Sequence, residues 1–222
     1  MTPDPARTRP ADLPAWFPKW ASQIGDLFFS GTTAAFVLHG NTYDLFRIGG
    51  DDGAPRYGVL AEFLAEQLFG RWSLVLHYDL GRGLRAFAGR DEKRLKEMVT
   101  LANRKVGDLS ALPKDPAATF AILDRFVRNN VMAAEDDRLS VAVIMDHASY
   151  VFPTGEPGRL NMQASSQLVT MLNWAMSPHV KRMNMAFVMI DEKLSDVSDR
   201  LAGNPHVATI EVPLPDQPAR EA

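Results

Sequence analysis

The chain has 222 residues, a net charge of -3 and no cysteine, a size that fits one large domain. The missing cysteines exclude disulfides, thiolate zinc sites and cysteine nucleophiles, and they agree with a cytoplasmic protein. The balanced charge and the lack of any apolar run near the roughly 20 residues that span a bilayer argue against nucleic-acid and membrane partners.

The predicted elements follow a proline-rich start. Residues 1–17 carry four prolines before Trp16 and are expected to form a flexible arm. The apolar spacing predicts a helix over 18–30 and then a short strand over 34–39. A second amphipathic helix is expected within 57–70 and a strand over 73–78. Gly81 and Gly83 then indicate a turn into a short hairpin arm.

The rest of the chain alternates between helices and strands. Helices are predicted within 91–107, 114–133, 160–178 and 195–204, and strands within 140–146, 183–192 and 206–216. The strands are continuous apolar runs instead of alternating patterns, which is typical of a parallel sheet covered on both faces. The sequence therefore predicts a three-layer αβα domain over 18–216, followed by a tail over 217–222.

Three of the predicted strands end in a carboxylate, namely Asp79, Asp146 and Asp191. Ligands bind at the carboxyl ends of such strands, so the three side chains are candidate site residues. One interpretation is structural, because a buried strand needs a polar residue where it meets solvent. Another is a magnesium-dependent phosphohydrolase that uses the three carboxylates as metal ligands. His147, directly after Asp146, is either a candidate base or a local hydrogen-bonding residue.

Several stretches in order resemble the ATPase core of AAA+ proteins. The segments "RLSVAVIMDHASYVFP", "LVTMLNWAMSP" and "NMAFVMIDEKLSDVSDRLAGNPHVATIEVPLPD" carry the resemblance over 138–216, and "AAFVLHGNTYDLF" and "WSLVLHYD" fit the first two core strands more loosely. The resemblance implies a five-stranded core ordered 5-1-4-3-2 and a ring-forming ATPase that remodels proteins. It also implies a nucleotide site at Gly40, Asn41, Thr42 and Asp191, a magnesium ion at Asp146, and catalytic positions at Asp146 and His147.

The chain departs from the pattern of an active member. A phosphate-binding loop needs a Gly-Lys pair, but this chain has none, and no lysine lies between Lys19 and Lys93. His147 stands where a glutamate orients the attacking water. Asp191 and Glu192 replace the usual polar Asn or Thr. Arginines are missing at the expected places before the last strand, and the chain ends where a helical lid subdomain is expected.

These departures predict a catalytically degenerate AAA+ module. We expect it to be the N-terminal module of a larger protein-remodelling ATPase, serving assembly or the binding of a protein partner or substrate. Its companions would be identical copies in a ring or a second AAA module of the same chain. ATP and Mg²⁺ are expected to bind weakly or not at all. An open alternative is weak ATP binding, without hydrolysis, through the amides of Gly40 and Asn41.

Overall fold

The computed structural model describes residues 13–14, 16–49, 55–155 and 161–215. Most of the predicted arm and the predicted tail over 217–222 lie outside the described residues. Trp16 and Phe17 belong to the packed domain. The Phe17 ring lies 5.6 Å from that of Phe63, and the guanidinium of Arg47 lies 5.0 Å from the Trp16 ring. Packing on the domain therefore begins before the expected boundary at residue 18.

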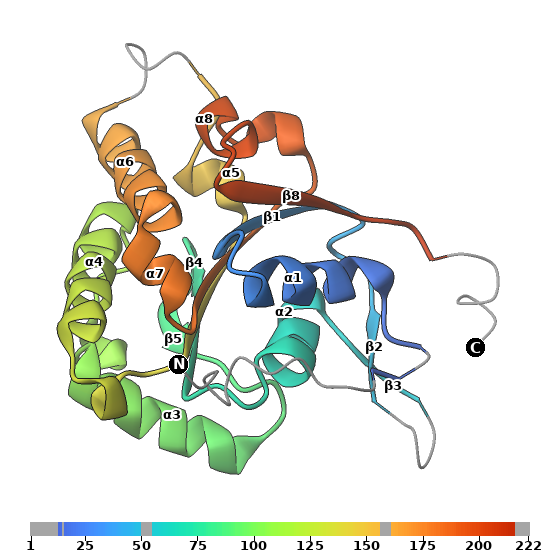
Figure 1. Cartoon of the computed structure of the whole chain (residues 1–222), viewed down its shortest axis with the longest axis horizontal. Coiled ribbons are helices and arrows are strands. Elements are labelled where there is room, and N and C mark those ends of the chain that lie inside the picture. The colour runs from blue at the N-terminus through green and yellow to red at the C-terminus, as the bar shows by residue number, and fades with distance from the viewer. Residues whose placement is uncertain (1–12, 15, 50–54, 156–160, 216–222) are drawn as a thin grey trace.

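The main sheet has six strands in the order β5-β4-β6-β7-β1-β8 (Figure 1). The five parallel strands, taken from β8 to β4, have the predicted order 5-1-4-3-2, which is confirmed. The sheet has one strand more than the five predicted, because β5 pairs antiparallel with β4 at the edge, as the predicted hairpin arm required. The strands are β1 (Ala35–Gly40), β4 (Leu74–Asp79), β5 (Gly83–Ala86), β6 (Val141–Asp146), β7 (Met185–Ile190) and β8 (Val207–Val212).

The central strands are buried along their whole apolar length, which explains why they read as continuous apolar runs. In β6 the five residues from Val141 to Met145 are all buried, and β7 is buried throughout. Such runs suit a sheet that is covered on both faces, since both sets of side chains lose contact with water. The parallel register of β6 on β7 places Asp146 opposite Ile190, so the carboxyl ends of these strands meet at one edge.

Helices cover both faces of the sheet (Figure 1). On one side Trp20 of α1 packs against Phe63 of α2 at 5.3 Å between ring centroids. On the other, Trp174 of α6 stacks between Phe120 of α4 and Phe187 of β7. The helices are α1 (Lys19–Phe29), α2 (Leu60–Phe63) with its π-helical continuation Leu64–Leu68, α3 (Glu92–Lys105), α4 (Pro116–Met132), α5 (Ala148–Val151), α6 (Met162–Met176), α7 (Pro178–Arg182) and α8 (Asp199–Ala202).

Sequence analysis missed the hairpin of β2 (Phe46–Gly49) and β3 (Arg56–Gly58), as well as the short helices α5 and α7. The hairpin lies between β1 and α2. Its strands have four and three residues, too few to show a period of two. The run "GGDDGAP" between them is rich in turn-forming residues and was the available signal.

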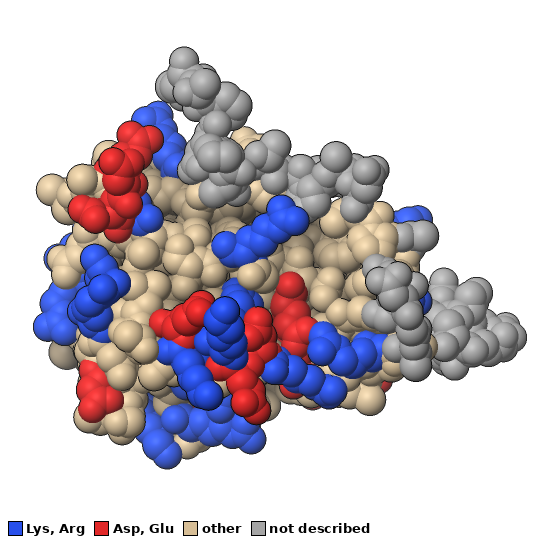
Figure 2. All heavy atoms as spheres, turned by 90° about the horizontal axis from the view of Figure 1, so that it is seen from below, with Lys and Arg blue, Asp and Glu red and all other residues tan. Residues whose placement is uncertain are grey.

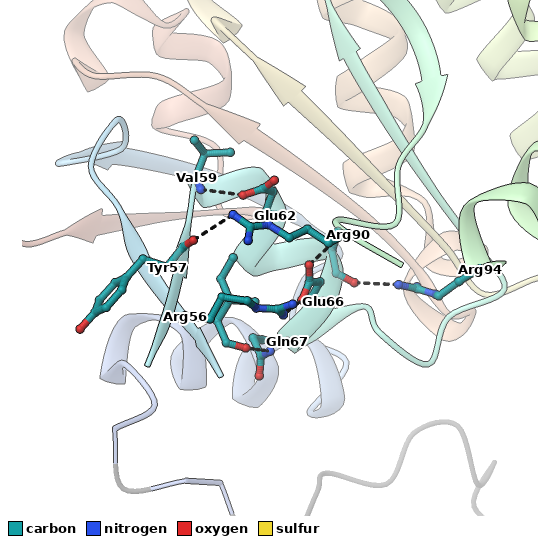
Figure 3. A network of polar contacts seen from close by, with 10 residues as sticks. Arg56, Tyr57, Val59, Glu62, Glu66, Gln67, Arg90 and Arg94 are labelled. Atoms are coloured by element: carbon teal, nitrogen blue, oxygen red, sulfur yellow. Dashed lines mark hydrogen bonds and ion pairs between the residues drawn. The ribbon is translucent and has the colours of Figure 1, made fainter. Parts of the chain in front are cut away.

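A polar network joins this hairpin to the helix that follows and to the start of α3 (Figure 3). The Glu66 carboxylate pairs with the Arg56 guanidinium of β3 and accepts from the backbone N–H of Arg90 at 3.0 Å. Gln67 donates to the carbonyl of Ile48 in β2 at 2.5 Å. Arg94 donates to the carbonyls of Ala65 and Phe69, at 3.1 and 2.6 Å. These bonds hold the hairpin against the body of the domain.

The charged surface is mixed in sign. Figure 2 views the molecule from below Figure 1, where α3 lies, and it shows basic and acidic side chains interspersed over this face. The sequence of α3, EKRLKEMVTLANRK, alternates both signs in the same way. This pattern is typical of a solvated helix face and offers no one-signed patch to a nucleic acid.

Candidate functional site at the carboxyl edge of the sheet

The candidate residues lie at the carboxyl edge of the sheet, as the sequence predicted. Asp79 ends β4, Asp146 ends β6, and Asp191 follows β7 directly. Gly40 ends β1 and leads into the loop that carries Asn41 and Thr42. Because these strands are neighbours and parallel, their ends bring residues far apart in the sequence to one edge.

Asp146 pairs with a buried histidine that sequence analysis did not single out. His77 of β4 is only 1% exposed, and its Nε2 lies 2.7 Å from Oδ2 of Asp146. The guanidinium of Arg85 in β5 donates to Nδ1 of the same ring at 2.9 Å. Since a guanidinium only donates, Nδ1 accepts and the ring proton sits on Nε2, where it is donated to Asp146. One oxygen of Asp146 is therefore bound within the protein.

His147 points across the edge to the loop after β1. Its Nδ1 lies 2.8 Å from the Tyr43 hydroxyl, and the two rings stack at 5.5 Å between centroids. The backbone of His147 is left-handed, with φ 54° and ψ 50°, which is uncommon for a residue with a Cβ. This turn sends the chain from β6 into α5 and sets the imidazole beside Tyr43.

Tyr43 sits in a negative environment. Burial, followed by the carboxylates of Asp191, Asp146 and Glu192, raises the pKa of the Tyr43 phenol to about 12. Each of these carboxylates makes the phenolate less favourable, because like charges repel. The edge therefore presents an aromatic pair within a field of negative charge, and such a field opposes the approach of another anion.

Asp191 is a structural acceptor. It is 7% exposed, its Oδ2 accepts from the backbone N–H of Ser149 at 2.7 Å, and its Oδ1 accepts from the N–H of Glu192 at 2.9 Å. Its carbonyl accepts from the Thr42 hydroxyl at 3.3 Å. Asp191 thus joins the turn after β6 to the loop after β1, and its two carboxylate oxygens are both engaged.

The backbone amides that were predicted to bind phosphate already donate hydrogen bonds within the protein. Gly40 donates to the carbonyl of Glu192, Asn41 to that of Val212 and Thr42 to that of Gly40, each at 2.9 Å. Gly40 has φ 96°, and a Cβ there would lie 2.7 Å from the Val212 carbonyl oxygen. The loop after β1 is therefore pinned to β8 and to the end of β7, and a phosphate would have to displace these bonds.

The three strand-end carboxylates do not form the metal site that the phosphohydrolase alternative required. Asp79 Oδ1 accepts from the Arg82 N–H at 2.7 Å, and its Oδ2 lies 3.6 Å from the Arg85 guanidinium. Within the described residues no three acidic or imidazole side chains are grouped so as to hold a metal ion. Asp79 and Asp191 each accept from nearby backbone N–H groups, and Asp146 accepts from His77, so each carboxylate has its own hydrogen-bond donors within the protein.

The helix after β1 also lacks a phosphate cradle. In a phosphate-binding loop, that helix begins directly after the loop and its free N–H groups face the anion. Here the β2–β3 hairpin intervenes, and α2 starts only at Leu60. The Glu62 carboxylate accepts from the Val59 N–H at 3.1 Å, so the protein's own anion occupies the helix start. The residues present do not fit a triphosphate with its magnesium ion.

The class of protein follows from this fold: a Rossmann-like α/β domain with the strand order of the AAA+ core. The family model of the AAA+ chaperone N-terminal Rossmann-like domain matches residues 7–213. The chain belongs to this family.

Similarity to individual proteins is weaker. No curated protein matches the chain. Among solved structures, a chain of the E. coli MS115-1 HORMA:CdnC:Trip13 complex is 15% identical, with a TM-score of 0.43. The match covers 91% of this chain and 57% of that one, so the present chain spans little more than half of it. A similarity of this size carries no information about activity. No helix among the described residues has the length and hydropathy needed to cross a membrane.

Proposed function

We propose that this domain is a non-hydrolysing module of an AAA+ protein-remodelling ATPase. In this role it serves assembly and the binding of protein partners, while ATP is hydrolysed by another module of the same chain or of the same assembly. The observation that carries the proposal is the β2–β3 hairpin between β1 and α2, together with Glu62 at the start of α2. These features stand where a hydrolysing relative needs a lysine and free amides.

The electrostatics of the edge support the same conclusion. Catalysis of phosphoryl transfer depends on cationic groups that offset the charge of the phosphates. The side-chain charges that raise the pKa of Tyr43 are chiefly the carboxylates of Asp191, Asp146 and Glu192. Arg85 is turned to His77 and Asp79. ATP and Mg²⁺ are therefore proposed to bind this domain weakly or not at all.

The proposed partner role rests on what the edge exposes. Tyr43, Leu45 and Tyr150 are large side chains that remain accessible at the carboxyl edge, and His147 lies between the two tyrosines. Aromatic side chains of this kind are enriched at protein interfaces. The proposed AAA-like domain over 18–216 joins other copies, or a second AAA module, in the assembly.

The test is ATP turnover and ATP binding by the purified chain, with and without magnesium. We expect no magnesium-dependent phosphate release above background and no binding of fluorescent ATP at low micromolar concentration. Asp146→Asn is the matched variant, because it keeps the acceptor for His77 and removes the charge a metal would need. Turnover near about one per second that is lost in Asp146→Asn would overturn the proposal.

A further inference from the structure

Three aromatic rings lie together at the carboxyl edge of the sheet, defined here as the edge aromatic cluster: Tyr43, His147 and Tyr150. The imidazole of His147 stacks on Tyr43, with 5.5 Å between ring centroids, and meets Tyr150 at a steep angle with 6.3 Å between centroids. The two tyrosines are 51% and 72% exposed. The imidazole therefore supports two tyrosine rings whose remaining surface is accessible to a ligand.

The edge aromatic cluster is held in place by the segments that carry it. The Tyr43 hydroxyl lies 2.8 Å from Nδ1 of His147. In the same loop the Asn41 amide donates to the Asp44 carboxylate at 2.9 Å. The left-handed turn at His147 leads directly into α5, where the Tyr150 N–H donates to the His147 carbonyl at 3.0 Å. A ligand that binds these rings therefore has little side-chain motion to arrest.

Two carboxylates beside the edge aromatic cluster have oxygens to spare. Asp146 uses Oδ2 to accept from His77, and Oδ1 has no hydrogen-bond partner among the described residues. Glu192 is exposed, and within the described part of the chain its carboxylate accepts no hydrogen bond. No lysine or arginine of the described residues forms an ion pair with either acid. Both carboxylates help to raise the pKa of Tyr43 to about 12, which shows that their field reaches the phenol.

Aromatic faces and unpaired carboxylates attract the same kind of ligand. The face of a tyrosine ring is electrically negative and binds cations, as a carboxylate does. A guanidinium suits both groups, because it is planar, stacks on aromatic rings and donates two parallel hydrogen bonds to a carboxylate. An ammonium is a compact and strongly hydrated charge, so it gains less from the rings. The surface is therefore complementary to an arginine side chain.

We propose that the edge aromatic cluster, together with Asp146 and Glu192, binds an arginine on an extended segment of a protein partner. The guanidinium stacks on an exposed tyrosine ring and donates to the free carboxylate oxygens. Leu45, 63% exposed in the loop after β1, adds apolar contact for the methylene stem. The inference rests on the proposed function, because it takes this edge as a surface that binds protein, and it adds the chemistry of the partner.

The contacts available set the strength of binding. One exposed cation–π contact or one exposed ion pair changes an affinity by about two- to fivefold. A short basic peptide is therefore expected to bind with a Kd between about 0.1 and 1 mM, and more weakly as salt is added, because the charges are exposed. The longer segment of a natural partner would add contacts outside the cluster.

Fluorescence anisotropy of short labelled peptides tests the chemistry. The probe is fluorescein-labelled Gly-Ser-Arg-Gly-Arg-Ser-Gly, titrated with the purified chain at about 20 mM salt. We expect this peptide to bind, the peptide with lysine in place of arginine to bind at least about threefold more weakly, and the peptide with glutamate not to bind. Absence of arginine-peptide binding up to about millimolar protein, or equal binding of the lysine peptide, would overturn the proposal.

Paired variants test the location. Glu192→Gln and Tyr150→Ala are each expected to weaken arginine-peptide binding about two- to fivefold. Their matched controls are Glu97→Gln, which removes an exposed charge from α3, and Tyr150→Phe, which keeps the ring face. Both controls should bind like wild type, and thermal melts check that every variant folds. An equal loss in Glu97→Gln and Glu192→Gln, or in Tyr150→Phe and Tyr150→Ala, would refute the site.

The ATP assay separates this proposal from the proposed function. A chain that hydrolyses ATP and also binds the arginine peptide with the expected variant effects would overturn the non-hydrolysing role and support the arginine site. A chain that neither hydrolyses ATP nor binds the peptide would overturn the arginine site alone.

Discussion

Two imidazoles at the carboxyl edge have different environments. His77 is enclosed between Asp146 and Arg85 and acts as a buried link between β4, β5 and β6. His147 is exposed, and its ring stacks on Tyr43. The first is placed by the register of the sheet and the second by a left-handed turn. Their chemistry is therefore not interchangeable, although each lies next to or against Asp146.

The left-handed backbone of His147 leads to a prediction about stability. His147→Gly and His147→Ala both remove the bond to Tyr43, but only glycine adopts φ 54° without a Cβ penalty. We expect the glycine variant to have the higher free energy of unfolding, by about 1 kcal/mol, in urea titrations. His179, exposed in the helix α7, is the control, and there alanine should be the more stable of the two. An alanine variant as stable as glycine at residue 147 would contradict the expectation.

Tyr43 leads to a prediction about pH. Its pKa is raised to about 12, above the ordinary value of 10.0, by burial and by the nearby carboxylates. The folded state therefore holds the phenolic proton more tightly than the unfolded state does. The contribution to stability is complete below pH 10 and is lost as the pH rises from 10 toward about 12.

Absorbance titration of the phenolate checks this value. Tyr78 also has its pKa raised to about 12, chiefly by burial, so the difference between wild type and Tyr43→Phe isolates the single group. The difference titration is expected to have its midpoint near pH 12. A midpoint near pH 10 would show that the carboxylates and the burial do not act on this phenol.

At the scale of elements, the hairpin and the helix after it behave as one unit. Glu66 lies in the π-helical turn and reaches both Arg56 of β3 and the backbone before α3. Gly89 has φ 62°, and a Cβ at that position would collide with the Glu66 carboxylate. Two features therefore favour glycine at residue 89: the positive φ of its backbone and the close approach of the Glu66 carboxylate.

Removing the Glu66 carboxylate should loosen this unit. The side chain is 13% exposed, and Glu66→Ala leaves the Arg90 N–H and the Arg56 guanidinium without their acceptor. We expect a loss of about 1–3 kcal/mol in the free energy of unfolding and faster amide exchange at Arg90. Glu66→Gln, which keeps one acceptor, should lose less. Glu97→Ala, exposed on α3, is the control and should change stability by less than about 0.5 kcal/mol. Equal effects at 66 and 97 would contradict this role.

At the scale of the whole molecule, a sheet with the AAA+ strand order carries the edge at which we propose that ATP binds weakly or not at all. The parallel strands still bring Asp146, Asp191 and the β1 loop together. The proposal rests on the β2–β3 hairpin, on Glu62 and on the amides of Gly40 and Asn41, which already donate hydrogen bonds within the protein.

The sequence by itself determined the layers and the five parallel strands, because strands buried on both faces appear in the sequence as unbroken apolar runs. It determined the strand order because the C-terminal motifs resemble the AAA+ core. It also located the strand-end carboxylates, and it excluded a phosphate-binding lysine. Only the tertiary structure decided what those groups touch. His77 lies inside an apolar run, and nothing local shows that its ring meets Asp146 from the next strand. The bonds from Ser149 to Asp191 and from Arg90 to Glu66 likewise depend on how segments distant in the sequence pack together.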